Sequence, residues 1–131
     1  MEPVLNDYQE AVRNRITKIT TALEHELGLD GWLQITHQFY PGFDSDETGT
    51  TAETFPQWEY RCASITWFIP VAATQTDTEL EAAAIHEYLH LLLAPIATLM
   101  PKGRGVEKLE EFVTESLMRV IGHARGMTNI R

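Results

Sequence analysis

The stretch 84-AIHEYLHL-91 contains the one spacing in this chain that ordinary helix packing does not require. Residues four apart on an α-helix project from the same face, so His86 and His90 are expected to point the same way. In such an HExxH arrangement two neutral imidazoles supply zinc ligands, and the carboxylate beside the first takes a proton from a water held between them. The stretch therefore predicts a Zn²⁺ site with His86 and His90 as ligands and Glu87 as general base.

A helix that follows the motif offers candidates for a third ligand. Its apolar residues recur at core spacing, at Val106, Leu109, Val113, Leu117, Val120 and Ile121. Glu110 falls within this stripe, where an unpaired carboxylate would carry a large desolvation cost. A zinc ion would offset that cost, so Glu110 is the preferred ligand. Glu110 could instead turn to solvent or pair with an arginine, and Glu111, which lies off the stripe, is the rival ligand.

The segments before the motif predict one helix and two strands. Apolar side chains recur at three- and four-residue steps over residues 3–28, from a proline suited to a first helical turn to a glycine that ends the helix. Residues 32–40 and 60–69 alternate apolar and polar side chains, as strands with one buried face do. We expect these strands to pair, with His37 as a structural histidine. Residues 41–57 are predicted to be an acidic surface loop.

The motif helix has predicted ends and a predicted core face. Thr78 and Glu81 have the spacing of a capping box, so the helix is expected to begin near residue 78. Pro95 is expected to end or kink it, and residues 101–105 form a turn rich in proline and glycine. The core side chains of this helix are expected to be Ile85, Leu89, Leu92 and Ile96.

Composition narrows the class of protein. A length of 131 residues and 44% apolar content predict a single domain, residues 1–131. The net charge of −9 argues against general binding to nucleic acid or to anionic membranes. Cys62 is the only cysteine, which excludes an internal disulfide and a cysteine-based zinc site within the chain. The apolar run 91–100 is too short to span a bilayer and the N-terminus does not read as a signal peptide, so we expect a cytoplasmic protein.

Motifs between residues 32 and 121 resemble those of the small HExxH zinc metallopeptidase-like proteins of phages and prophages. The resemblance rests on the strand 60-YRCASI-65, on the HExxH helix that continues as 90-HLLLAP-95, and on the helix segment 110-EEFVT-114. It implies a minimal gluzincin-like layout, in which a glutamate on the helix after the motif is the third ligand. Both Glu110 and Glu111 fit that pattern. The resemblance also implies a peptide or protein substrate and, for a phage-encoded chain, the host cytoplasm.

These observations predict an α+β fold with a minimal zincin-like layout: an N-terminal helix, a short antiparallel sheet, the HExxH helix and a following ligand-bearing helix. The expected function is zinc-dependent peptide hydrolysis, with ligands His86, His90 and Glu110 and with Glu87 as base. Thr114 and Glu115 are candidates to orient the histidines. An exposed sheet edge could accept an extended peptide. A zinc-binding interaction module with little turnover is the alternative, and a partner-binding helical protein without metal is a third hypothesis.

Overall fold

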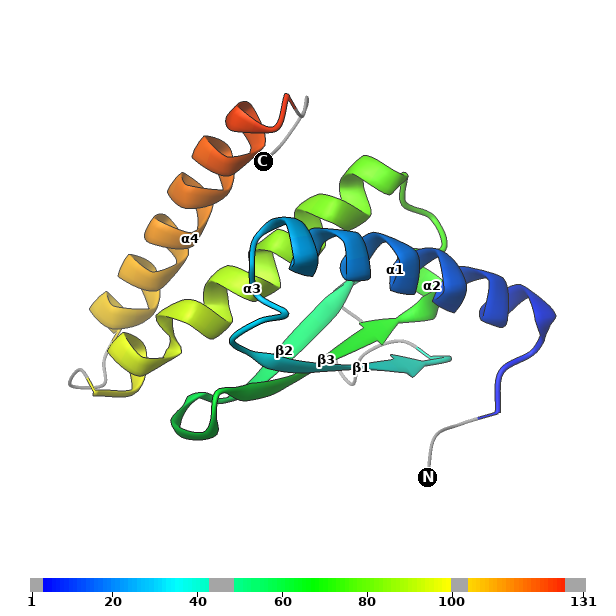
Figure 1. Ribbon diagram of the computed structural model, residues 1–131, viewed down its shortest axis with the longest axis horizontal. Coiled ribbons are helices and arrows are strands. Elements are labelled where there is room, and N and C mark those ends of the chain that lie inside the picture. The colour runs from blue at the N-terminus through cyan, green and yellow to red at the C-terminus, as the bar shows by residue number, and fades with distance from the viewer. Residues whose placement is uncertain (1–3, 43–48, 100–103, 127–131) are drawn as a thin grey trace.

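A computed structural model of the chain describes residues 4–42, 49–99 and 104–126. These residues form a small sheet and several helices, which confirms the predicted α+β class (Figure 1). The elements in chain order are α1 (Asp7–Glu26), β1 (Gln34–Tyr40), β2 (Ala52–Gln57), the short 3-10 helix η1 (Trp58–Tyr60), β3 (Cys62–Phe68), the single-turn α2 (Ile69–Ala72), α3 (Asp77–Leu99) and α4 (Arg104–Ala124). None of the helices in the described ranges is long and apolar enough to cross a membrane.

The sheet is mixed rather than antiparallel. Its strand order is β1-β3-β2, with β1 parallel to β3 and β2 antiparallel to β3. The two predicted strands, β1 and β3, do pair, but the prediction that they are antiparallel is wrong, and the antiparallel partner of β3 is the unpredicted β2. The error follows from β2, which lies inside the segment 41–57 that was predicted to be a loop. Because β2 adds a second reversal of the chain, β1 and β3 run in the same direction.

Strand β2 is an edge strand that tolerates a proline. The main-chain N–H of Phe68 donates to the carbonyl of Thr51, and the register pairs Ala52 with Trp67. Peptide groups alternate along an antiparallel ladder, so those of residues 52, 54 and 56 point away from β3. An N–H at position 56 would have had no partner in β3. The proline at this position therefore removes no hydrogen bond between the two strands. Of the predicted loop, residues 43–48 lie outside the described part of the chain.

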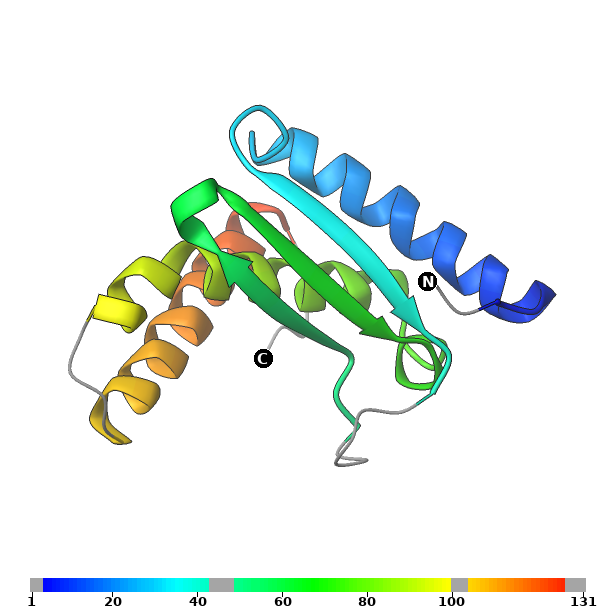
Figure 2. The same ribbon diagram turned by 90° about the horizontal axis from the view of Figure 1, so that it is seen from below.

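Helices α1 and α3 cover one face of the sheet and leave the other face open (Figure 2). On β3 the side chains of Ala63, Ile65 and Trp67 point toward the helices and are buried. Neighbouring positions on the open face of β1, among them Gln34 and Thr36, are exposed. The core between helices and sheet includes Val12, Ile16, Leu23, Leu80, Ala84, Ile85, Tyr88 and Leu89. The alternation predicted for the two strands is thus confirmed.

Helices α1 and α3 begin at capping boxes that differ from the predicted starts. Helix α1 begins after Asn6, whose side chain accepts from the N–H of Gln9, so the predicted start at Pro3 is wrong. Helix α3 begins after Thr76. The hydroxyl of Thr76 accepts a hydrogen bond from the main-chain N–H of Glu79, and the carboxylate of Glu79 accepts one from the main-chain N–H of Thr76. The box thus lies two residues before the predicted one. Each reciprocal pair satisfies N–H groups that have no partner within the helix.

The second half of α3 differs from the prediction. Pro95 lies inside the helix, which continues to Leu99. Ile85 and Leu89 are buried as expected, but Leu92 and Ile96 are 42% and 59% exposed. Figure 1 shows the reason: α1 crosses the first half of α3, and the second half extends beyond it beside α4.

A polar network joins α1, the sheet and α3. The indole N–H of Trp67 donates to Nδ1 of His37, so the proton of this imidazole is on Nε2, which lies 2.6 Å from Oε2 of Glu24. The hydroxyl of Tyr88 donates to the same carboxylate oxygen at 2.7 Å. Burial, together with the Glu24 carboxylate, raises the pKa of Tyr88, so its hydroxyl keeps its proton. His37 is a structural histidine, as predicted.

The Tyr88→Phe substitution is expected to lower the free energy of unfolding by about 1 to 3 kcal/mol, because it removes a donor from a half-buried carboxylate. Urea denaturation of the purified protein measures the change. Tyr8→Phe is the matched control, since Tyr8 also lies on a helix but is 65% exposed. Equal stability of the two variants would show that the network does not hold α3.

Candidate metal centre

The two motif histidines lie side by side on α3. Their Nε2 atoms are 2.8 Å apart and their ring centroids 4.6 Å apart. Their side chains are 26% and 22% exposed, so both sit at the margin of the core and remain reachable from solvent. The helical spacing of four places His86 and His90 on one face, as the sequence predicted.

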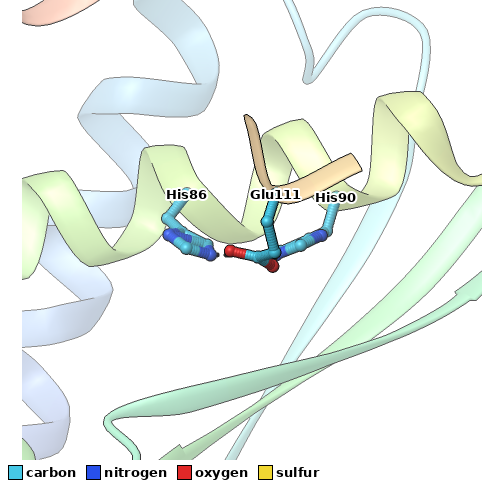
Figure 3. Close-up of side chains that lie close together, drawn as sticks. All are labelled: His86, His90 and Glu111. Carbon is cyan, nitrogen blue, oxygen red and sulfur yellow. Dashed lines mark hydrogen bonds and ion pairs between the residues drawn. The ribbon is translucent and has the colours of Figure 1, made fainter. Parts of the chain in front are cut away.

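Glu111 on α4 completes a group of three possible ligands with His86 and His90. Its Oε1 lies 3.2 Å from Nε2 of His90, and one ligand atom from each of the three residues lies within 4.8 Å of the others. Figure 3 shows the Glu111 carboxylate reaching from α4 to the space between the two imidazole rings. Two imidazoles and one carboxylate are a donor set that suits zinc and other divalent transition metals.

Glu110, the preferred third ligand in the sequence analysis, occupies a different place. Its Oε2 lies 2.6 Å from Nδ1 of His90, on the side of the ring away from the His86 contact. A carboxylate at Nδ1 fixes the tautomer of a histidine and leaves Nε2 free to bind a metal. The geometry therefore favours Glu111 as a ligand and Glu110 as the group that orients His90. Glu110 as a ligand stays a prediction, but its carboxylate is engaged at Nδ1 of His90, whereas Glu111 lies within the group of possible ligands.

His86 has a comparable carboxylate, whereas Thr114 provides no such contact. Oε1 of Glu115 lies 3.8 Å from Nδ1 of His86, within ion-pair distance. Thr114 is fully buried, and its hydroxyl has no hydrogen-bond partner among the described residues. Of the two residues predicted to orient the histidines, Glu115 is therefore near one of them, and Thr114 makes no hydrogen bond to either.

The apolar stripe predicted for α4 is only partly in the core: Ile121 packs against it and Val113 is half-buried, but three other members are exposed, against the prediction. Leu109, Leu117 and Val120 are 49%, 38% and 65% exposed, whereas Thr114 and Met118 are buried. Three carboxylates of α4, those of Glu110, Glu111 and Glu115, instead lie within ion-pair distance of the imidazoles of α3. A sequence signal for this existed: Glu111 and Glu115 are four residues apart, as are His86 and His90, which suits two antiparallel helices with facing pairs.

Burial shapes the protonation of the site. Burial is the largest cause that lowers the pKa of His86, and the neighbouring His90 lowers it further, against an opposite effect of Glu111 and Glu115. A lowered pKa keeps this imidazole neutral, which is the form that binds a metal.

Glu87 lies beside the metal group and outside it. The hydroxyl of Thr54, on β2, donates to Oε1 of Glu87 at 2.6 Å and also approaches its main-chain oxygen at 3.3 Å. Burial is the largest cause that raises the pKa of Glu87, and the bond from Thr54 opposes it. The sequence analysis could not find Thr54, because it placed this residue in a loop.

A cleft of about 730 Å³ opens between β2, α3 and Glu110 of α4. Its lining residues are Ala52, Glu53, Thr54, Phe55, Pro56, Glu87, His90, Ala94, Thr98 and Glu110. The cleft thus brings the expected base, Glu87, and two of the expected ligands, His90 and Glu110, together with the free edge of β2.

Comparisons with protein-family models, with curated proteins and with solved structures find no significant match to this chain. The resemblance to the HExxH proteins of phages and prophages therefore rests on the sequence motifs and stays a prediction.

The two candidate ligands on α4 can be separated by zinc affinity. We expect Glu111→Gln to weaken zinc binding by more than about a hundredfold, because it removes a ligand, and Glu110→Gln by about ten- to a hundredfold, because it removes an orienting carboxylate. Competition with a chelator at neutral pH, on protein without a histidine tag, measures both. Glu107→Gln, an exposed glutamate on α4, serves as control. A greater loss in Glu110→Gln would identify Glu110 as the ligand.

Proposed function

We propose that this protein is a zinc-dependent metallopeptidase that hydrolyses peptide bonds in the cleft between β2 and α3. The observation that carries the proposal is the position of Glu87, a half-buried carboxylate that is held by Thr54 beside the group of His86, His90 and Glu111. A carboxylate adjacent to a three-ligand group, rather than within it, has the placement of a general base.

The donor set fits zinc. His86, His90 and Glu111 would be the ligands, with Glu110 and Glu115 orienting the imidazoles through Nδ1. Zinc bound there would supply Lewis acidity for the attack of water on a carbonyl.

Glu87 would move the protons. It would take one from the attacking water and return it to the leaving amine. Burial raises the pKa of Glu87, which suits a group that must both accept and release a proton near neutral pH. The hydroxyl of Thr54 binds Oε1 and thereby leaves the second carboxylate oxygen for the water.

The edge of β2 would bind the substrate. The N–H and C=O groups of Ala52 and Thr54 point away from β3, toward the side on which the cleft lies. An extended peptide could form main-chain hydrogen bonds with these groups as an added strand. The same hydroxyl that holds Glu87 ties this edge to α3, so the bound peptide would lie next to the base.

A zinc-binding interaction module with little turnover is the second candidate. It is favoured by one feature of the described cleft, whose lining residues include no tyrosine, arginine or lysine to steady charge on a reacting carbonyl. In this alternative the same residues would hold zinc, and the β2 edge would bind a peptide without cleaving it.

The Glu87→Gln variant separates the two functions. We expect it to retain zinc near one equivalent, since Glu87 is outside the ligand group, and to lose at least about a hundredfold of the cleavage rate, since it lacks a general base. Elemental analysis and cleavage of a peptide library measure the two properties. Glu59→Gln, at an exposed position, is the control.

The outcomes for the wild-type protein also differ. A zinc-containing wild type that cleaves no peptide in the library would support the interaction module. Protein that is purified in the presence of zinc and holds far less than one equivalent would contradict both zinc-based functions.

A further inference from the structure

Two side chains of β2 lie on the open face of the sheet and also line the cleft. Register pairs Glu53 with Thr66 and Phe55 with Ser64, so both point to the face that the helices leave uncovered. Both residues also line the cleft. A peptide strand added beside β2 would place alternate side chains next to them, because cross-strand neighbours on one face lie about 5 Å apart. The side chain between those two would point the opposite way, into the cleft.

Glu53 is the carboxylate of the cleft that is available to a substrate. The charged side chains that line the described cleft are Glu53, Glu87 and Glu110, all of them acidic. Glu87 is bound by Thr54 and Glu110 by His90. The side chain of Glu53 is exposed and has no hydrogen bond or ion pair within the described ranges. Its charge contributes to the raised pKa of Glu87, so the two carboxylates lie close enough to interact.

Phe55 is an apolar surface beside this charge. It is 55% exposed, and its neighbours on the open face are polar. It also lines a second hollow, of about 460 Å³, together with Gln34, Thr36, Pro56, Gln57, Cys62, Ala63 and Ser64. An apolar side chain of a bound peptide would cover this ring and remove its surface from water.

We propose that the cleft selects an extended peptide segment with a basic residue and an apolar residue two positions apart. The basic side chain pairs with Glu53 and the apolar one packs on Phe55. Main-chain bonds to Ala52 and Thr54 hold any extended peptide, and these two side chains choose among sequences. This specificity rests on the proposed peptide-binding function, and it assigns substrate recognition to residues outside the metal group.

The test uses the zinc-loaded Glu87→Gln variant, so that peptides bind without being cut. Fluorescent octapeptides would contain Lys-x-Leu, Glu-x-Leu or Lys-x-Ser at their centre. Each would also be made in the reverse order, because the peptide could run parallel or antiparallel to β2. Anisotropy titrations measure the dissociation constants. We expect the Lys and Leu peptide to bind about five- to tenfold more tightly than the peptide with glutamate and about threefold more tightly than the peptide with serine.

Further substitutions assign these preferences to residues. Adding Glu53→Lys should reverse the preference between lysine and glutamate, whereas Glu59→Lys, with the same change in net charge at an exposed position outside the cleft, should not. Phe55→Ser should abolish the preference for leucine over serine.

Equal binding of all peptides, absence of binding, or equal shifts in Glu53→Lys and Glu59→Lys would overturn the proposed specificity. Zinc content and cleavage by the wild-type protein are measured separately. The peptide-binding results can therefore contradict the proposed specificity without contradicting the metallopeptidase function.

Discussion

The pairing of α4 carboxylates with α3 imidazoles is the interaction on which the C-terminal half of the structure depends. Glu110 approaches Nδ1 of His90, Glu115 approaches Nδ1 of His86, and Glu111 lies between the rings. Partly buried carboxylates are costly unless they are paired, and the imidazoles provide that pairing. Helix α4 therefore presents its acidic side to α3, although this leaves apolar side chains such as Val120 exposed. The contact between these two helices therefore includes the three residues that could hold a metal ion, His86, His90 and Glu111.

Helix α3 is held by polar contacts on its other sides as well. Tyr88, which follows Glu87 in the sequence, donates to Glu24 of α1. Thr54 of β2 donates to Glu87 itself. At the far end of α4, Arg125 pairs with Glu26 of α1 and Glu81 of α3, which joins three helices. These contacts restrict the rotation and sliding of α3, and a functional group that is supported in this way keeps its position when a ligand arrives.

Strand β2 lines the cleft together with Glu87 and His90 of α3, and its outer edge is free. Sequence reasoning missed it because acidic residues, glycines and Pro56 are typical of loops. A proline such as Pro56 fits a strand only at the edge of a sheet, at a position whose N–H would point away from the neighbouring strand. Whether residue 56 is such a position depends on which edge of β2 faces β3. The same geometry leaves the peptide groups of Ala52 and Thr54 free beside the cleft. The edge position that admits Pro56 is thus also what leaves these main-chain groups unpaired by β3.

The sequence by itself determined the local parts of this protein: the helical spacing that places His86 and His90 on one face, Glu87 beside them, and the alternation of β3. These follow from the geometry of a single helix or strand. Only the tertiary structure placed Glu111, rather than Glu110, in the group of possible ligands and made β1 run parallel to β3. Neighbouring residues on a helix differ by about 100° in direction, so the choice of ligand depends on how α4 is rotated against α3. That rotation is set by contacts between segments distant in sequence, which no local pattern records.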